Sequence, residues 1–263
     1  MGRLTELSRS LEGARVIVTG AASGMGRATA HLFADEGAKV LVADWNEDGV
    51  SGVVEEIRSA HGSSAAEGVH GDVSRQEGRS AMVDRCVTAF GGVDVLVNNA
   101  GISRVSSVFS PEDEFTTNWD ATIAVNLTAQ AHLIRTALPH LMAAPNGGRV
   151  INIASTEAFV ATGGLSAYTA AKHGVVGLTK SFAVELGRHG VTVNAVCPGP
   201  IDTGMTASVT QDRREKYTRI KVPLRRYGMP EEVAHMTVSI ALPAMRYMTG
   251  SVVLVDGGLV ANH

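Results

Sequence analysis

Short runs of apolar, mostly β-branched residues recur along the chain, and longer amphipathic segments separate them. Each run is apolar at nearly every position, which is typical of strands covered on both faces of a parallel sheet. Their alternation with helical segments predicts a doubly wound α/β fold, with helices on both faces. The predicted strands are residues 15–19, 39–43, 93–97, 149–153, 191–196 and 251–255, with a weaker one at 65–70. The predicted helices are residues 24–36, 48–60, 75–90, 119–142, 166–188 and 231–241.

No linker, repeat or low-complexity stretch interrupts this pattern, so residues 1–263 are predicted to form a single domain. A chain of this length buries roughly three quarters of its unfolded surface, so one core can stabilise it. Two cysteines, Cys86 and Cys197, are too few for a disulfide framework and lack metal-ligand spacing. We expect two reduced thiols packed as small apolar groups, and no metal in the active site.

The charge pattern excludes several partners. The net charge is −3, so no global basic field recruits nucleic acid or an anionic membrane. No uninterrupted apolar run reaches the roughly 18 residues of a membrane-spanning helix. The first 15 residues are polar and lack the apolar core of a signal peptide. We therefore expect a cytoplasmic protein.

A glycine-rich stretch follows the first predicted strand directly and opens the first predicted helix. It reads Thr19-Gly-Ala-Ala-Ser-Gly-Met-Gly26, a TGxxxGxG pattern. Three glycines let the chain turn sharply and let backbone N–H groups approach a pyrophosphate at the positive end of the helix. A plain strand-to-helix turn is the alternative, but the position at the first strand–helix junction favours a nucleotide site. The predicted cofactor contacts here are Gly20, Ser23, Gly24, Met25 and Gly26.

Asp44 ends the second predicted strand, near the spacing of about 20 residues at which an acidic residue meets the adenosine ribose. A carboxylate accepts hydrogen bonds from both ribose hydroxyls and repels a 2′-phosphate. Neither Ser23 nor Trp45, both expected beside the cofactor, offers a cation for such a phosphate. The sequence therefore favours NAD over NADP, although a solvated aspartate at a strand end is the alternative interpretation.

Two further strand ends carry polar and turn-forming residues. Asp72 and Val73 follow the third strand and can bracket an adenine. Asn98-Asn-Ala-Gly101 follows the fourth strand, and its small residues permit backbone contact beside a ribose. Ligands of open α/β sheets bind outside the carboxyl ends of the strands, so these segments indicate the same site.

Ser155, Tyr168 and Lys172 form the candidate reaction centre. Ser155 lies just past the fifth strand, and Tyr168 and Lys172 share one face of the following helix at positions i and i+4. Hydride transfer to a ketone needs an acid near the carbonyl oxygen, and the reverse reaction needs a base. Since a free tyrosine has a pKa of about 10, we expect the Lys172 ammonium to lower the pKa of Tyr168. Ser155 can hold the substrate oxygen by a hydrogen bond.

With these motifs, the chain resembles the short-chain dehydrogenase/reductase family over roughly residues 11–258. The resemblance implies a Rossmann-type fold with a seven-stranded parallel sheet. It also implies a catalytic tetrad in which Tyr168 is the acid and base, Ser155 orients the substrate, and Lys172 binds the nicotinamide ribose. Asn126 matches the position whose asparagine holds a water in a proton relay with the lysine. From its own context Asn126 is only a polar residue inside an apolar helix.

The resemblance implies further cofactor contacts. The loop after the sixth strand would pass the nicotinamide carboxamide, and Asn99 would contact the cofactor near its ribose. Ser23 stands where many NADP-dependent members carry a basic residue, which agrees with the interpretation of Asp44. The residues implied after the sixth strand are Pro198, Gly199, Ile201 and Thr203.

The substrate end is less defined. Residues 202–229 depart from the strand–helix alternation, and the resemblance implies a substrate lid there. Lys and Arg outnumber Asp and Glu in this segment, which suits either a solvated amphipathic helix or contact with an acidic substrate. Met205 can line a pliable pocket. Glu157, two residues beyond Ser155, can accept a hydrogen bond from a second hydroxyl of a diol or polyol, or can be a loop residue in an ion pair.

The main functional hypothesis is an NAD-dependent oxidoreductase for a secondary alcohol or ketone, cyclic or polyhydroxylated. The alternatives are a 3-oxoacyl thioester reductase and a non-catalytic nucleotide-sensing module of the same fold. Asp44 opposes the first, and the complete set of Ser155, Tyr168 and Lys172 opposes the second. The family resemblance further implies a homo-oligomer, with a tetramer favoured over a dimer.

Overall fold

Seven parallel strands form one sheet, in the order β3-β2-β1-β4-β5-β6-β7. The computed structural model describes residues 6–262, so residues 1–5 and 263 of the predicted domain lie outside the described residues. The doubly wound fold is confirmed, and each predicted strand ends within two residues of an observed one. The strands are β1 (Arg15–Thr19), β2 (Lys39–Asp44), β3 (Ala66–His70), β4 (Val95–Asn98), β5 (Arg149–Ile153), β6 (Thr192–Pro198) and β7 (Val252–Val255).

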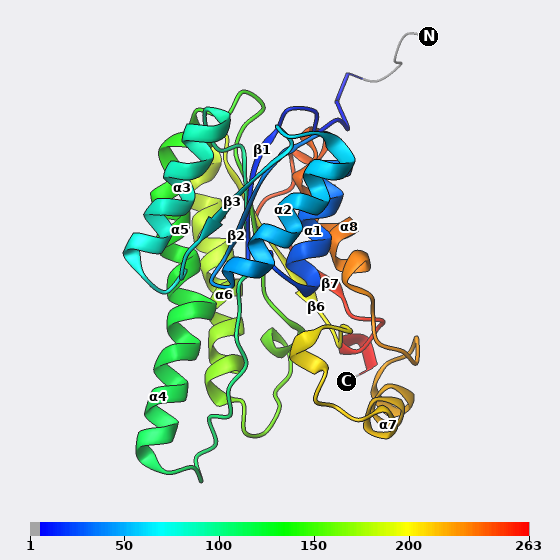
Figure 1. Ribbon diagram of the computed structural model, residues 1–263. Helices are drawn as coiled ribbons and strands as arrows, with labels where there is room; N and C mark the ends of the chain where they lie inside the picture. The colour runs from blue at the N-terminus through cyan, green and yellow to red at the C-terminus, as the bar shows by residue number, and fades with distance from the viewer. Residues whose placement is uncertain (1–5, 263) are drawn as a thin grey trace.

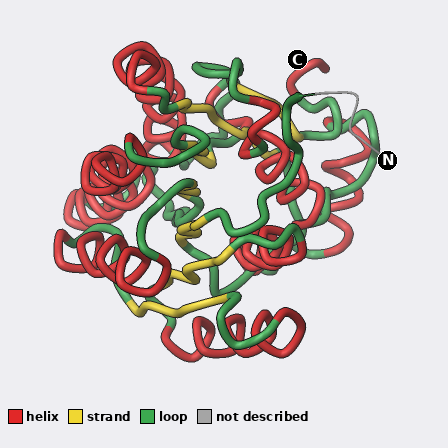
Figure 2. Tube along the Cα trace, turned by 90° about the horizontal axis from the view of Figure 1, so that it is seen from above, coloured by secondary structure: helices red, strands yellow, loops and turns green. Residues whose placement is uncertain are grey.

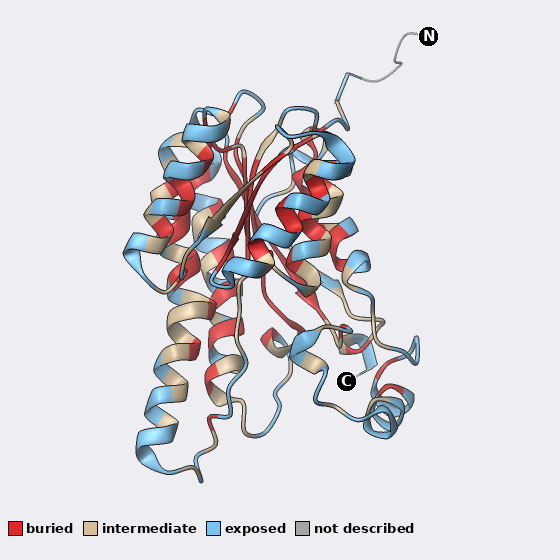
Figure 3. Cartoon of the chain, viewed as in Figure 1, coloured by how far each residue is buried: buried red, intermediate tan, exposed pale blue. Residues whose placement is uncertain are grey.

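Helices cover both faces of the sheet (Figures 1 and 2). Successive strand residues point to opposite faces, so Val16 packs into one apolar layer and Ile17 into the other. This is why the inner strands are apolar at most positions and form the buried centre of Figure 3, whereas the outer strands β3 and β7 are only partly buried. One face carries α1 (Gly24–Asp35), α2 (Glu47–His61) and α8 (Pro230–Ala241); the other carries α3 (Gln76–Phe90), α5 (Ala129–Met142) and α6 (Ser166–Leu186).

The predicted helix at residues 119–142 is wrong at its start. Helix α4 (Glu112–Ile123) begins seven residues earlier, and a π-helical turn (Ala124–Thr128) joins it to α5. Only Thr122 of α4 is buried, so the helix has no apolar stripe that the sequence pattern would reveal. Three acidic residues in its first turn favour a helix start instead.

The carboxyl ends of all seven strands lie at one edge of the sheet, toward the bottom of Figure 1. The strand order reverses between β1 and β4, which are neighbours in the sheet although β2 and β3 separate them in sequence. A crevice forms at such a reversal, because the two following connections turn to opposite faces. Helix α7 (Gln211–Lys221), inside the predicted lid, lies at the same end of the molecule.

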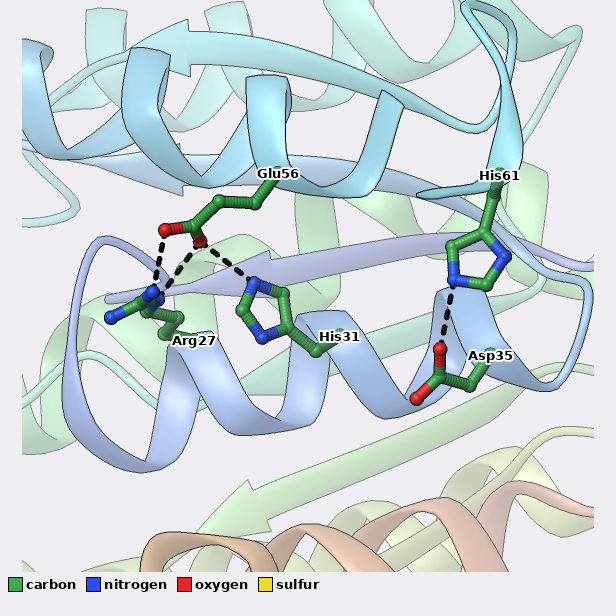
Figure 4. Close-up of polar contacts among 5 residues, drawn as sticks. All are labelled: Arg27, His31, Asp35, Glu56 and His61. Carbon is green, nitrogen blue, oxygen red and sulfur yellow. Dashed lines mark hydrogen bonds and ion pairs between the residues drawn. The ribbon is translucent and has the colours of Figure 1, made fainter. Parts of the chain in front are cut away.

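Ion pairs join α1 to α2 on the surface, and Figure 4 shows both groups of contacts. Glu56 accepts from the Arg27 guanidinium at 2.5 and 3.0 Å, and His31 Nε2 lies 3.0 Å from the same carboxylate. At the other end, His61 Nε2 lies 2.8 Å from Asp35 Oδ1. These contacts fix the two helices that follow β1 and β2, the strands that lead into the predicted nucleotide site.

The outer strand β3 also carries charged contacts. Glu67 on this strand pairs with Arg58 of α2, whose Nη2 lies 2.6 Å from Oε1, and with Arg85 of α3. Arg58 Nε additionally donates to the Ala66 carbonyl at 3.0 Å. Within residues 6–262, no helix is both long and apolar enough to cross a lipid bilayer.

Candidate active site

The glycine loop between β1 and α1 is closed too tightly for side chains. Gly20 and Gly24 have φ of +64° and +54°, a region that favours glycine. A Cβ on Gly26 would lie 2.1 Å from the Gly20 carbonyl oxygen. The predicted need for glycine at these positions is therefore confirmed by the local geometry.

The amino end of α1 is suited to an anion. Its N-cap residue Ser23 makes no side-chain capping bond, and its first turn contains no acidic residue. The neighbouring α2 differs, because Asn46 caps Gly49 N at 3.2 Å and acidic residues occupy the first turn. The free N–H groups and positive end of α1 thus fit a dinucleotide pyrophosphate.

The end of β4 is fastened to the glycine loop by Asn99. Its Nδ2 donates to the carbonyls of Thr19 and Gly20 at 2.9 and 3.1 Å. Thr19 Oγ1 in turn accepts from Asn99 N and Ala100 N at 3.0 and 3.1 Å. The Asn99 side chain thus shapes the loop itself, and its predicted contact with the cofactor ribose stays a prediction.

Asp44, which is predicted to contact the adenosine ribose, lies at the end of β2 beside the glycine loop. Its Oδ2 accepts from Ala22 N and its Oδ1 from Asn46 N, both at 3.0 Å. Asp44 as a whole is 7% exposed, whereas the following Trp45 is 78% exposed. These two hydrogen bonds fix the orientation of the Asp44 side chain, and both donors are backbone amides.

The next strand end has a simpler arrangement. Asp72 Oδ1 accepts from Ser74 N at 2.8 Å in the turn that leads into α3, and Val73 is buried. Gly71 N donates to the Asp44 carbonyl at 2.8 Å, which places this turn beside the end of β2. The predicted adenine-binding residues thus lie next to Asp44.

The loop after β6 approaches the glycine loop from the other side. Gly199 N donates to the Val255 carbonyl at 3.0 Å, and Ile201 is buried. A Cβ on Gly24 would lie 3.3 Å from Thr203 Cγ2. The segment predicted to contact the pyrophosphate and the segment predicted to contact the nicotinamide therefore lie side by side.

Asn126 lies in the π-helical turn and is fully buried. Its Oδ1 accepts from Ile102 N and its Nδ2 donates to the Ile102 carbonyl, both at 2.8 Å. A Cβ on Gly101 would lie 3.3 Å from Asn126 Oδ1 and 3.9 Å from Lys172 Nζ. Asn126 and Lys172 therefore both lie beside the loop after β4, and the role of Asn126 in a proton relay stays a prediction.

Ser155, Tyr168 and Lys172 come together as predicted. Lys172 Nζ donates to the Ile153 carbonyl at the end of β5, at 2.8 Å, and lies 5.5 Å from the centroid of the Tyr168 ring. Ser155 begins the 3₁₀ turn (Thr156–Ala158) after β5, and its side chain forms a hydrogen bond that favours the phenolate of Tyr168. The side chains of Ser155, Tyr168 and Lys172 therefore lie together near the carboxyl end of β5.

We expected a lowered pKa for Tyr168, and this prediction is wrong for the protein without cofactor or substrate. Burial raises the pKa of Tyr168, and the hydrogen bond with Ser155 opposes that shift only in part. Burial also lowers the pKa of Lys172 from 10.5 to about 8. The sequence shows that the two groups are neighbours, but it does not show that both are removed from water, which disfavours both charged forms.

Two further residues, Met205 and Glu157, were predicted to contact the substrate. Met205 is in a 3₁₀ turn (Gly204–Thr206) of the lid and is 52% exposed. The Glu157 carboxylate already has partners within the chain, because it accepts from Thr162 and Thr169. The role of Glu157 toward a substrate hydroxyl stays a prediction.

Sequence reasoning noted Thr19 and Asn98 only as parts of motifs and did not predict the hydrogen bonds that they form. A series of buried polar side chains on β4, β5 and α6 is one example. Asn98 Nδ2 donates to Asn152 Oδ1 at 2.9 Å, and Asn152 Nδ2 donates to Thr179 Oγ1 at 3.0 Å. An asparagine inside an apolar strand is the signal that would have revealed this series, since a buried amide needs partners. Within residues 6–262, no three His, Cys, Asp or Glu side chains gather as metal ligands.

Together, the sheet, the glycine loop and the reaction centre define a nucleotide-binding oxidoreductase fold. A family model described as enoyl-(acyl carrier protein) reductase matches residues 20–260. The chain is 37% identical to the 3-oxoacyl-[acyl-carrier-protein] reductase of Thermotoga maritima, with 95% of this chain and 99% of that protein covered. It is also 37% identical to the D-beta-hydroxybutyrate dehydrogenase of Cupriavidus necator, with 96% and 100% covered. The chain belongs to the short-chain dehydrogenase/reductase family.

Solved structures agree. A crystal structure from Beutenbergia cavernae, provisionally assigned as an NAD(P)-dependent gluconate 5-dehydrogenase, has a TM-score of 0.87 and 38% identity, and covers 96% of this chain and 98% of its own. It holds NADP at low occupancy. A provisionally assigned gluconate dehydrogenase from Agrobacterium tumefaciens has a TM-score of 0.89 and 30% identity, and covers 97% and 99%. The protein is therefore an oxidoreductase that uses a nicotinamide cofactor.

Proposed function

We propose that this protein transfers a hydride between NAD and the carbinol or carbonyl carbon of a secondary alcohol or ketone. The observation that carries the proposal is the convergence of Ser155, Tyr168 and Lys172 outside the carboxyl end of β5. The fixed Asp44 carboxylate beside the glycine loop supports NAD. When bound, the nicotinamide ring supplies or accepts the hydride.

The chain's own residues handle the proton. The Tyr168 hydroxyl gives its proton to the carbonyl oxygen during reduction and takes it from the alcohol during oxidation. Ser155 holds the same substrate oxygen by a hydrogen bond. Lys172 is fixed by the Ile153 carbonyl at the ring of Tyr168, and its charge favours the phenolate that forms during oxidation.

A polyhydroxylated acid is the substrate class that we propose first. Several exposed cations lie in the lid segment, among them Arg213, Lys216 and Arg219 of α7. Two of the similar solved structures carry gluconate dehydrogenase in their names. A cation in the lid and a hydroxyl-binding site below it suit a substrate that has both a carboxylate and several hydroxyls.

A 3-oxoacyl thioester reductase is the second candidate. The relative from Thermotoga maritima carries that name, and the basic lid also suits the phosphate of a pantetheine thioester. Asp44 opposes this candidate, since a carboxylate at the ribose repels the 2′-phosphate of NADP, on which such biosynthetic reductases usually draw.

A substrate panel tests both candidates and the cofactor choice. Oxidation of gluconate, 3-hydroxybutyrate and simple secondary alcohols would be followed at the absorbance of the reduced nicotinamide, with NAD and NADP in parallel. Reduction of a 3-oxoacyl thioester would be assayed with both reduced cofactors. Turnover with NAD and a hydroxy acid supports the proposal. Turnover confined to the thioester with NADPH supports the second candidate, and nucleotide binding without turnover supports a sensor.

We further propose a cytoplasmic homo-oligomer, with a tetramer favoured. Apolar side chains remain exposed on the long helices, where Val184 of α6 is 85% exposed and Met142 of α5 is 44% exposed. Sedimentation velocity of the purified chain measures the number of subunits, and a monomer at micromolar concentration would refute this part of the proposal.

A further inference from the structure

Glu157 lies in the short turn after β5 and is bound on both carboxylate oxygens by threonines. Its Oε1 accepts from Thr162 Oγ1 at 2.5 Å. Its Oε2 accepts from Thr162 N at 3.0 Å and from Thr169 Oγ1 at 2.7 Å. Hydrogen bonds to a charged acceptor are roughly twice as strong as those between neutral groups, so three of them together fix this carboxylate firmly.

Glu157 contacts both segments that carry the reaction centre, namely the turn after β5 with Ser155 and the first turn of α6 with Tyr168. Glu157 N donates to Ser155 Oγ at 3.2 Å, while Thr169 directly follows Tyr168 in the first turn of α6. Residues 159–165 connect these two segments as a loop of partly and fully exposed residues with two glycines, Gly163 and Gly164. A loop of this kind does not by itself hold α6 against the turn after β5.

We propose that Glu157 is a positioning residue, whose carboxylate fastens the Ser155 turn to the Tyr168 helix through Thr162 and Thr169. The inference rests on the proposed function, because it assumes that Ser155 and Tyr168 act on one substrate oxygen. Both hydroxyls must reach that oxygen in the same geometry, and a misplacement of about 1 Å can cost about a hundredfold in rate. Glu157 thereby fixes the distance between the Ser155 and Tyr168 hydroxyls.

The charge of Glu157 has a second effect on the same tyrosine. Burial raises the pKa of Tyr168 most, and the nearby Glu157 carboxylate raises it further. Besides Glu157, the groups that face Tyr168 are Ser155 in the same turn, Lys172 on its own helix and Cys197 on β6. Removing the charge of Glu157 therefore lowers the pKa of Tyr168, whereas removing only the threonine hydroxyls leaves that charge in place.

Two kinds of variant separate these effects. The double variant Thr162→Val, Thr169→Val removes the hydroxyl donors, and Glu157→Gln removes the charge but retains an acceptor oxygen. With the best substrate of the wild-type enzyme, we expect the double variant to lower kcat about tenfold or more. The Kd for NAD, measured by calorimetry, stays unchanged, and Thr169→Ser retains the wild-type kcat. Glu185→Gln, which removes a carboxylate at an exposed site of α6, is the matched control for Glu157→Gln.

The pH dependence supplies a readout that a merely structural role would not move. We expect Glu157→Gln to shift the apparent pKa of the kcat/KM profile to lower pH, and the threonine double variant to leave it in place. An ultraviolet titration of the phenol, taken as the difference between each protein and its Tyr168→Phe counterpart, reports the same shift without any substrate.

Three results would overturn the inference. One is a threonine double variant with wild-type kcat and only a lower melting temperature. Another is a Glu157→Ala enzyme in which KM rises for a diol alone, because then the carboxylate acts on the substrate. The third is an unchanged phenol titration in Glu157→Gln. Failure of the proposed function looks different, since Tyr168→Phe would then retain full turnover.

Discussion

The Asp44 carboxylate accepts a hydrogen bond from the Ala22 amide at 3.0 Å, so the end of β2 is attached to the glycine loop. The residue that we assign to the adenosine ribose therefore also holds the backbone that we assign to the pyrophosphate. A change at Asp44 acts on both parts of the dinucleotide site.

The double variant Asp44→Ala, Trp45→Arg should change the cofactor preference. It removes the acceptor for the ribose hydroxyls and adds a cation for a 2′-phosphate. A hydrogen bond to a charged group contributes about 1.5–3 kcal/mol, so the ratio of kcat/KM for NAD to that for NADP should fall at least about tenfold. Asp48→Ala, at an exposed site of α2, is the control. A wild-type enzyme that already prefers NADP would contradict the assignment of Asp44.

Tyr168→Phe tests the proton donor. The variant keeps the ring and loses only the hydroxyl, so kcat should fall by about two to four orders of magnitude while the Kd for NAD stays within error. Tyr247→Phe is the control, because Tyr247 is fully exposed. Residual turnover near the wild-type level would remove Tyr168 from its assigned role.

Lys172 predicts a pH dependence of stability. Burial lowers its pKa from 10.5 to about 8, so the unfolded chain binds more protons than the folded chain between those values. The contribution of this group to the free energy of unfolding therefore rises with pH across that window, by at most a few kcal/mol at about 1.4 kcal/mol per pKa unit. Urea unfolding of wild type and Lys172→Met at several pH values measures the difference. Curves that stay parallel from pH 8 to 10.5 would contradict it.

Arg214 forms several contacts within the predicted lid, residues 202–229. Its guanidinium donates to Asp202 Oδ1 and to the Thr206 and Val209 carbonyls at 2.6, 2.7 and 3.1 Å, and lies 4.9 Å from the Tyr227 ring centroid. Lysine cannot reproduce this planar arrangement, so Arg214→Lys should speed proteolysis within residues 202–229 and raise the substrate KM several-fold. Arg135→Lys, at an exposed site of α5 outside residues 202–229, should change neither. Equal cleavage rates in both variants would mean that Arg214 does not secure the lid.

The sheet was predictable because strands buried on both faces are apolar at most positions. The start of helix α4 was not, since the only buried residue of this helix is Thr122 and its sequence shows no apolar stripe. In the site, Ser155, Tyr168 and Lys172 carry recognisable spacing, so they were found. The hydrogen-bond partners of Glu157 were not found, because Thr162 and Thr169 reach it only through the folded conformation of the loop, which no sequence spacing reveals. The direction of the Tyr168 pKa shift was missed for a related reason, since burial is a property of the whole fold.

The arginines on either side of Glu67 have a consequence outside catalysis. An outer strand offers unpaired N–H and C=O groups to any other extended chain, and charged side chains there discourage such pairing. Arg58 and Arg85 reach Glu67 from helices on opposite faces of the sheet and cover β3 with charge. If both were replaced by alanine, the expected defect is loss of solubility at high concentration, with turnover per folded molecule preserved.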